Sequence, residues 1–94
     1  MSRVRVVLVE GNDVFREALE LMLGTRHELE VVAAVASGAA AIEAGREHSP
    51  DVVLDGTDAK EELLAQLPGL AVVALDRDQE IDEIIAAIRQ AASR

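Results

Sequence analysis

The fold of this chain is decided by residues 4–13, which read VRVVLVEGND. Their apolar, β-branched part is typical of a parallel strand that is buried on both faces. The polar end, from Glu10 to Asp13, opens into a helix. A second apolar run, residues 51–54, also ends in a carboxylate, Asp55. Because the carboxyl ends of parallel strands meet at one edge of a sheet, Glu10, Asp13 and Asp55 are expected to converge there.

The rest of the chain continues this alternation of strand and helix. Apolar runs predict further strands at residues 29–36, 51–54 and 70–75. Helices are predicted to follow the capping residues Asn12, Ser37, Asp58 and Asp78. The order βαβαβαβα indicates one α/β domain, residues 1–94, in which helices cover both faces of a parallel sheet.

Composition and charge exclude several kinds of recognition. Half of the 94 residues are apolar, which is enough for one core. Phe15 is the only aromatic residue, so stacking on a base, a sugar or a flavin is not expected. The formal net charge is -9 and the basic residues are scattered, which argues against direct binding of nucleic acid.

Several patterns of catalytic and metal-binding residues are also missing. The absence of cysteine excludes disulfides, thiolate metal sites and thiol catalysis. His27 and His48 lack further ligands at metal spacing, and no Ser or Thr has a His partner that would make it a nucleophile. The apolar run near the N-terminus is too short for a signal peptide or a membrane span. We therefore expect a soluble, cytoplasmic protein that is not an enzyme.

Six segments together resemble a known family. They are residues 6–9, 14–19, 30–33, 50–54, 67–75 and 88–93. These segments are similar to the receiver domain of bacterial two-component response regulators, and most of all to the subgroup with a LuxR-type helix-turn-helix output domain. The resemblance covers nearly the whole chain. It implies a flavodoxin-like (CheY-like) doubly wound sheet with strand order 2-1-3-4, truncated at Arg94 before the family's fifth strand and fifth helix.

The resemblance also implies a phosphoacceptor pocket. In receivers, an acidic pair after the first strand holds Mg²⁺ beside an aspartate at the end of the third strand, which accepts a phosphoryl group. A hydroxyl residue after the fourth strand and a lysine from the fifth strand assist. By this resemblance Asp55 is the phosphoacceptor candidate, and Glu10, Asp13 and Asp76 form an acidic pocket around it. The candidate metal ligands are Glu10 and Asp55.

The same positions depart from the family's pattern. Gly11 follows Glu10 where the family has a second carboxylate, and Asp76 stands at the position of the switch hydroxyl. Asp55 comes one position early, so Gly56 stands at the acceptor position. A shift of one residue in a strand turns the side chain to the other face of the sheet. The sequence therefore leaves two alternatives open, weak binding of Mg²⁺ or Ca²⁺ and no cofactor at all.

The missing fifth strand has a consequence for assembly. The fourth strand would be an apolar sheet edge without Lys or Pro to protect it, and part of the apolar stripe on the last helix would stay exposed. A dimer or partner interface is therefore expected there. The residues expected to form it are Val72, Val73, Ile81, Ile84, Ile85 and Ile88.

These observations lead to a functional hypothesis. The chain is expected to be an atypical receiver-like signalling module in transcription regulation, which acts by protein contacts without the family's phosphorylation. The alternative is a phosphorylatable receiver that uses Asp55 and Mg²⁺. A third class, an enzyme or small-ligand binder of flavodoxin-like fold, is disfavoured because aromatic residues and nucleophile patterns are lacking.

Overall fold

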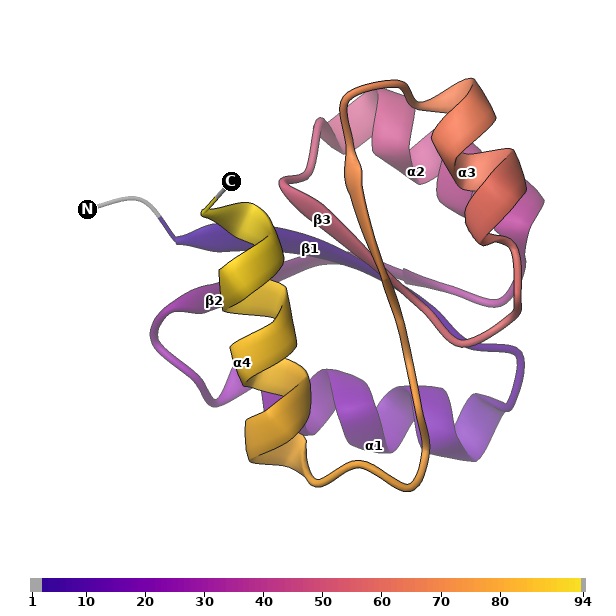
Figure 1. Cartoon of the computed structure of the whole chain (residues 1–94). Helices are drawn as coiled ribbons and strands as arrows, with labels where there is room; N and C mark the ends of the chain where they lie inside the picture. Colours follow the sequence, from indigo (N-terminus) through magenta and orange to yellow (C-terminus); the bar gives the residue numbers. More distant parts are fainter. Residues whose placement is uncertain (1–2, 94) are drawn as a thin grey trace.

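The first strand lies inside a parallel sheet whose other strands come from the whole length of the chain (Figure 1). The computed structural model describes residues 3–93. The elements in chain order are β1 (Val4–Val9), α1 (Asp13–Gly24), β2 (Leu29–Val35), α2 (Gly38–His48), β3 (Val52–Asp55), α3 (Lys60–Gln66), β4 (Ala71–Ala74) and α4 (Ile81–Ala92). The strands lie in the order β2-β1-β3-β4, and each neighbouring pair is parallel. The predicted α/β class and strand order are confirmed.

Alternate residues of the strands build two separate apolar layers. Val6 and Leu8 of β1 pack on the face that α1 and α4 cover. Val7 and Val9 pack on the opposite face, against α2 and α3. Figure 1 shows the two pairs of helices on the two sides of the sheet. Each face of this small sheet is therefore closed by two helices.

Helix α4 lies on the face of the sheet opposite to α2 and α3. Right-handed crossovers place α1 on one face, because the chain moves from β1 to β2, and α2 and α3 on the other face, because the chain then moves back across the sheet. A helix that leads to a further parallel strand beside β4 would lie on the face of α2 and α3. Instead, α4 packs on the face of α1. It is therefore not placed as such a crossover helix.

Two of the four predicted caps are confirmed. The side chains of Asn12 and Ser37 accept backbone N–H groups of the first turns of α1 and α2. The other two predictions are wrong. Asp58 has a positive φ of 66° and does not cap α3, whose N-cap is Ala59. The cap of α4 is Glu80, which forms a capping box with Glu83, two residues beyond the predicted Asp78. The second and fourth strands are each shorter than predicted, ending at Val35 and Ala74.

The apolar stripe of α4 is more deeply buried than expected. Ile84, Ile85 and Ile88 are at most 5% exposed and belong to the core between α4, α1 and the sheet. They are therefore unavailable to a partner, and the prediction that they form an interface is wrong. Ile81, at the start of the helix, is half-buried. The reason is that α4 lies over the sheet beside α1, which covers the stripe. In the described residues, no helix is long and apolar enough to cross a membrane.

Replacement of Leu54 in the centre of β3 tests this core. Leu54 is fully buried, so Leu54→Ala is expected to lower the free energy of unfolding by about 2–5 kcal/mol, through lost burial and the cavity left behind. Leu21→Ala is the matched control, because Leu21 is 73% exposed and its truncation should change stability by less than about 0.5 kcal/mol. Chemical denaturation followed by circular dichroism measures both. Equal effects would contradict the assigned core.

Candidate functional site

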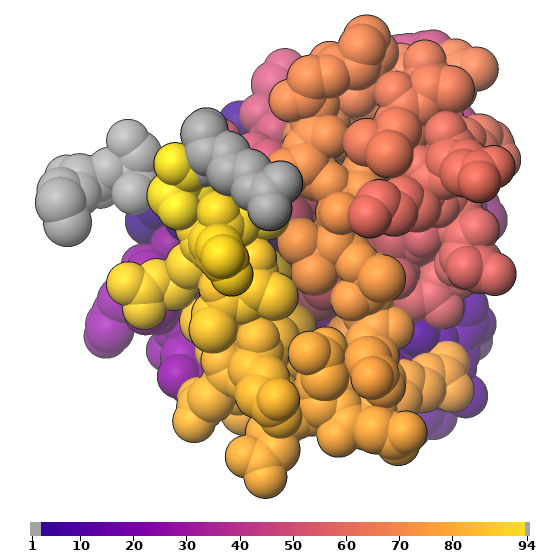
Figure 2. Space-filling model, in the orientation of Figure 1, coloured from indigo at the N-terminus to yellow at the C-terminus, as the bar shows by residue number. Residues whose placement is uncertain are grey.

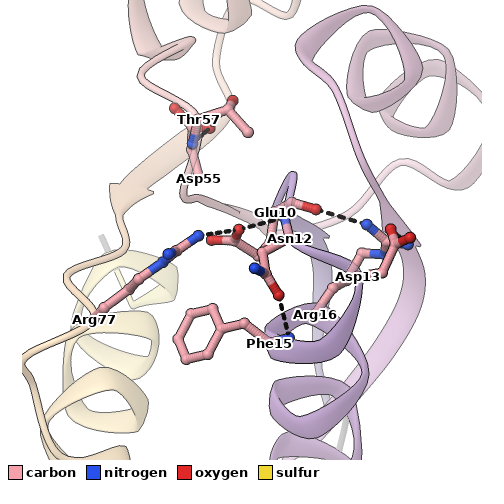
Figure 3. A network of polar contacts seen from close by, with 8 residues as sticks. All are labelled: Glu10, Asn12, Asp13, Phe15, Arg16, Asp55, Thr57 and Arg77. Carbon is pink, nitrogen blue, oxygen red and sulfur yellow. Dashed lines mark hydrogen bonds and ion pairs between the residues drawn. The ribbon is translucent and has the colours of Figure 1, made fainter.

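Two buried carboxylates stand at the carboxyl edge of the sheet. Glu10, directly after β1, is 1% exposed, and Asp55, the last residue of β3, is 4% exposed. In the register of the two strands Val9 lies opposite Asp55, so the residue after β3 that is level with Glu10 is Gly56. Side chains alternate along each strand, and the two carboxyl groups therefore leave the sheet on opposite faces. Figure 3 shows Glu10 turned toward Arg77 and Asp55 turned away toward Thr57.

Glu10 is held by a cation of the chain itself. Its Oε2 pairs with Nη2 of Arg77 at 2.5 Å and accepts the backbone N–H of Asn12 at 2.7 Å. Its backbone carbonyl accepts from Nη1 of Arg16 at 2.8 Å. The guanidinium carbon of Arg77 lies 4.9 Å from the centre of the Phe15 ring, in cation–π contact. Arg77 thus bridges β1, the start of α1 and the loop before α4 (Figure 3).

The pairing with Arg77 has an energetic reason. A carboxylate out of water loses several kcal/mol of hydration, which a close cation and hydrogen bonds can offset. The Glu10 side chain is buried, whereas 56% of the Arg77 side chain stays exposed, so the arginine spans from solvent into the pocket. Oε1 of Glu10 is buried and has no hydrogen-bond partner within the described part of the chain.

Asp55 stabilises the loop that follows it. Oδ1 accepts from the backbone N–H of Thr57 at 2.9 Å and from its hydroxyl at 2.6 Å, and Oδ2 accepts the N–H of Ala59 at 2.7 Å. Such a turn, in which an aspartate accepts backbone N–H groups ahead of it, is common at tight loops. These bonds hold the segment that contains Asp58 in its left-handed conformation. Both oxygens of Asp55 are therefore engaged inside the loop.

Gly56 occupies the place beside Glu10 that Asp55 does not reach. A Cβ added at Gly56 would lie 2.5 Å from Oε1 of Glu10 and 3.1 Å from Cδ2 of Leu75. The side-chain direction of position 56 thus leads into the pocket of Glu10 and Arg77. Position 56 therefore has room for the hydrogen of glycine but not for a side chain.

The predicted acidic pocket does not form. Asp13 is exposed and pairs with Arg16 at 2.7 Å in its own helix, and Asp76 accepts the N–H of Asp78 in its own loop. Among residues 3–93, no group of three or more His, Cys, Asp or Glu side chains could hold a metal ion. The prediction that Glu10, Asp13, Asp55 and Asp76 converge is wrong because their side chains leave the edge in different directions. The proposed metal pair of Glu10 and Asp55 is separated for the same reason.

Sequence reasoning missed Arg77, although a signal for it exists. Arg77 is the third residue after β4 and a lone basic residue between Asp76 and Asp78. The rule that brings residues after parallel strands to one edge applies to it as much as to Glu10. A search for carboxylates alone does not find the arginine that pairs with Glu10.

The expected interface residues of β4 lie at an open edge of the sheet. Val72 and Val73 are half-buried, and they line a surface hollow of about 420 Å³ together with residues of α3 and α4. Figure 2 shows the β4 segment, in orange, at the surface between α4 and the red α3 region. A larger hollow of about 750 Å³ lies between α1 and β2 and is lined by neither Glu10 nor Asp55.

Comparison with known proteins yields relatives of one kind. No protein-family model matches the chain. The transcriptional regulatory protein LnrK of Bacillus subtilis is 28% identical over 98 residues, which cover 96% of this chain and 44% of LnrK. The response regulator protein VraR of Staphylococcus saprophyticus is 30% identical over 93 residues, covering 90% of this chain and 44% of VraR. The chain spans less than half the length of these relatives.

A solved structure of similar size agrees with these relatives. The signal receiver domain of the response regulator NarL from Mycobacterium tuberculosis matches with a TM-score of 0.80 and 26% sequence identity. The match covers 99% of this chain and 98% of that domain. The resemblance to response-regulator receivers and the CheY-like fold class are thereby confirmed.

Substitution of Gly56 tests the geometry beside Glu10. Gly56→Ala is expected to lower the free energy of unfolding by about 1–3 kcal/mol, because the added methyl group displaces a buried, ion-paired carboxylate. Gly24→Ala is the matched control, since a Cβ there meets nothing within 4 Å. Thermal and chemical unfolding measure the difference. If the two variants were equally stable, position 56 would not face Glu10.

Proposed function

We propose that this chain is a receiver-type domain of the response-regulator kind that signals through protein contacts without phosphorylation of an aspartate. In this proposal it acts in the cytoplasm as a non-catalytic module in the regulation of transcription. It does not itself touch nucleic acid, in keeping with its net charge of -9.

One observation carries the proposal: the separation of Asp55 from Glu10. Transfer of a phosphoryl group to an aspartate requires a cation and the acceptor oxygen side by side, so that the charge on the phosphoryl oxygens is neutralised. Here the pocket of Glu10 contains Arg77, and the position that points into it is Gly56. The oxygens of Asp55 accept three hydrogen bonds on the other face.

The second candidate function is a phosphorylatable receiver that uses Asp55 with Mg²⁺. Its support is that the relatives include proteins named as response regulators and that Asp55 ends β3 at the carboxyl edge. It requires the loop at Thr57 to release Asp55, and it requires Arg77 to give way to a metal ion.

The partner in our proposal is a second copy of this chain, bound at the edge of β4. Leu75 donates its backbone N–H inward to the carbonyl of Asp55. Since successive residues turn their backbone groups to opposite sides, Ala74 and Val72 present theirs to the open edge. A self-complementary edge of this kind allows two copies to pair about a twofold axis.

The charge around this edge supports contact between two copies. The chain has eighteen acidic residues, yet none of them lines the hollow beside β4, where Lys60 is the one charged residue. Two copies could approach there without direct repulsion between carboxylates. The position of α4 on the face of α1 also argues that the edge is not reserved for a strand that α4 would introduce.

Incubation with Mg²⁺ and acetyl phosphate separates the two functions. We expect the intact mass to remain that of the unmodified chain, because Asp55 is tied into its loop away from Glu10. Asp55→Asn and Asp58→Asn serve as test and control variants. Gain of one phosphoryl group that is kept in Asp58→Asn and lost in Asp55→Asn would establish the second candidate instead.

Ala74→Pro tests the proposed pairing of β4. Proline removes an N–H that faces the open edge, so we expect the variant to remain folded but monomeric in light scattering at high concentration. Wild-type protein and the matched variant Ala74→Ser, which keeps the N–H, are expected to be dimeric. A monomeric wild-type protein, or a dimeric Ala74→Pro, would contradict pairing through this edge.

A further inference from the structure

We propose that the pocket of Glu10 is a cation site whose resident cation is Arg77, and that this ion pair excludes divalent ions and fixes the loop between β4 and α4. The inference deepens the proposed function, since it names what occupies the pocket in place of a metal. It concerns the state of the pocket and not the chemistry of Asp55, so it can fail while the proposed function stands.

The first support is the lack of space for an ion at either oxygen of Glu10. Oε2 is engaged by the Arg77 guanidinium and by the N–H of Asn12. The other oxygen, Oε1, is buried and faces Gly56, where an added Cβ would lie 2.5 Å from it. A hydrated Mg²⁺ ion keeps several waters and needs octahedral space, so it can enter only after Arg77 leaves.

The second support is the way in which Arg77 itself is positioned. Its guanidinium lies over the ring of Phe15 as well as on Glu10, so a neutral aromatic face and a carboxylate hold the same group. A planar guanidinium suits both partners at once, whereas a lysine ammonium would satisfy them less well. This arrangement is a fixed binding site and not a loose surface pair.

The third support is the connection that Arg77 makes through the fold. Arg77 belongs to the loop that leads from β4 to α4, and Glu10 and Phe15 belong to the end of β1 and the start of α1. The exposed pair of Arg26 and Asp82, at 2.9 Å, joins α4 to the segment after α1 on the same face. The buried end of the Arg77 contact makes it the stronger of the two links.

Arg77→Gln tests whether Arg77 fixes the loop between β4 and α4. This variant removes the charge, whereas Arg77→Lys keeps it and Arg26→Gln removes the exposed pair as a matched control. We expect amide hydrogen exchange in residues 75–80 to accelerate about tenfold in Arg77→Gln, with a smaller change in Arg77→Lys and none in that loop in Arg26→Gln. Unchanged exchange in this loop in Arg77→Gln would overturn the proposal that Arg77 fixes it.

Mn²⁺ tests the exclusion of divalent ions. Paramagnetic broadening of the amide signals of Gly11, Asn12 and Gly56 should be weak in the wild-type protein and clearly stronger in Arg77→Gln. The double variant Glu10→Gln with Arg77→Gln should return to the wild-type level, which separates this pocket from surface carboxylates. Equal broadening in wild type and Arg77→Gln would overturn the exclusion. Equal broadening without phosphorylation of wild-type Asp55 would overturn this inference and leave the proposed function standing, whereas phosphorylation of wild-type Asp55 would contradict both, because Mg²⁺ would then have displaced Arg77.

Discussion

The alternation of side chains along β1 and β3 is the constraint on which the rest of the molecule depends. Because Val9 lies opposite Asp55, residues 10 and 55 send their carboxyl groups to opposite faces of the sheet. The same alternation sorts the apolar side chains into two layers and thereby fixes where the helices pack. One residue of register therefore decides both the core and the chemistry available at its edge.

The balance of charge at that edge follows from the register. Glu10 is buried on one face, so it needs a cation, and the loop after β4 supplies Arg77. Asp55 lies on the other face and accepts N–H groups of its own loop. Each carboxylate is therefore engaged by different groups of its own surroundings. A shared ion, which would bring the two carboxylates together, is unnecessary for either.

The sequence predicted the large features because they rest on long periodic patterns. The four strands and the caps at Asn12 and Ser37 were within reach of apolar runs and local spacing, whereas the order of the strands was implied by the resemblance to receivers. The geometry of the loops could not be predicted in this way. Asp58 and Asp78 look like N-cap residues in the sequence, but the N-cap residues of α3 and α4 are Ala59 and Glu80. The chain also tolerates Gly45 inside α2 for a tertiary reason, because a Cβ there would lie 2.5 Å from Cδ1 of Leu67.

The candidate site was predicted only in part, for a related reason. Compared with the receiver pattern, Asp55 comes one position early, which predicts that its side chain turns to the other face of the sheet. Its hydrogen bonds agree with that direction. The role of Arg77 depends on a contact with Glu10 across 67 positions of sequence, which no local pattern contains. The burial of Ile84, Ile85 and Ile88 likewise depends on which face α4 takes, and that is decided by packing against α1.

The contact between Arg77 and Phe15 gives the molecule a natural spectroscopic probe. Phe15 is the sole aromatic residue of the chain, since tyrosine and tryptophan are absent. Its ring protons therefore give the only phenyl signals in the proton spectrum, and the ring lies beneath the guanidinium group. Their chemical shifts and ring-flip rates report on that one location without any label.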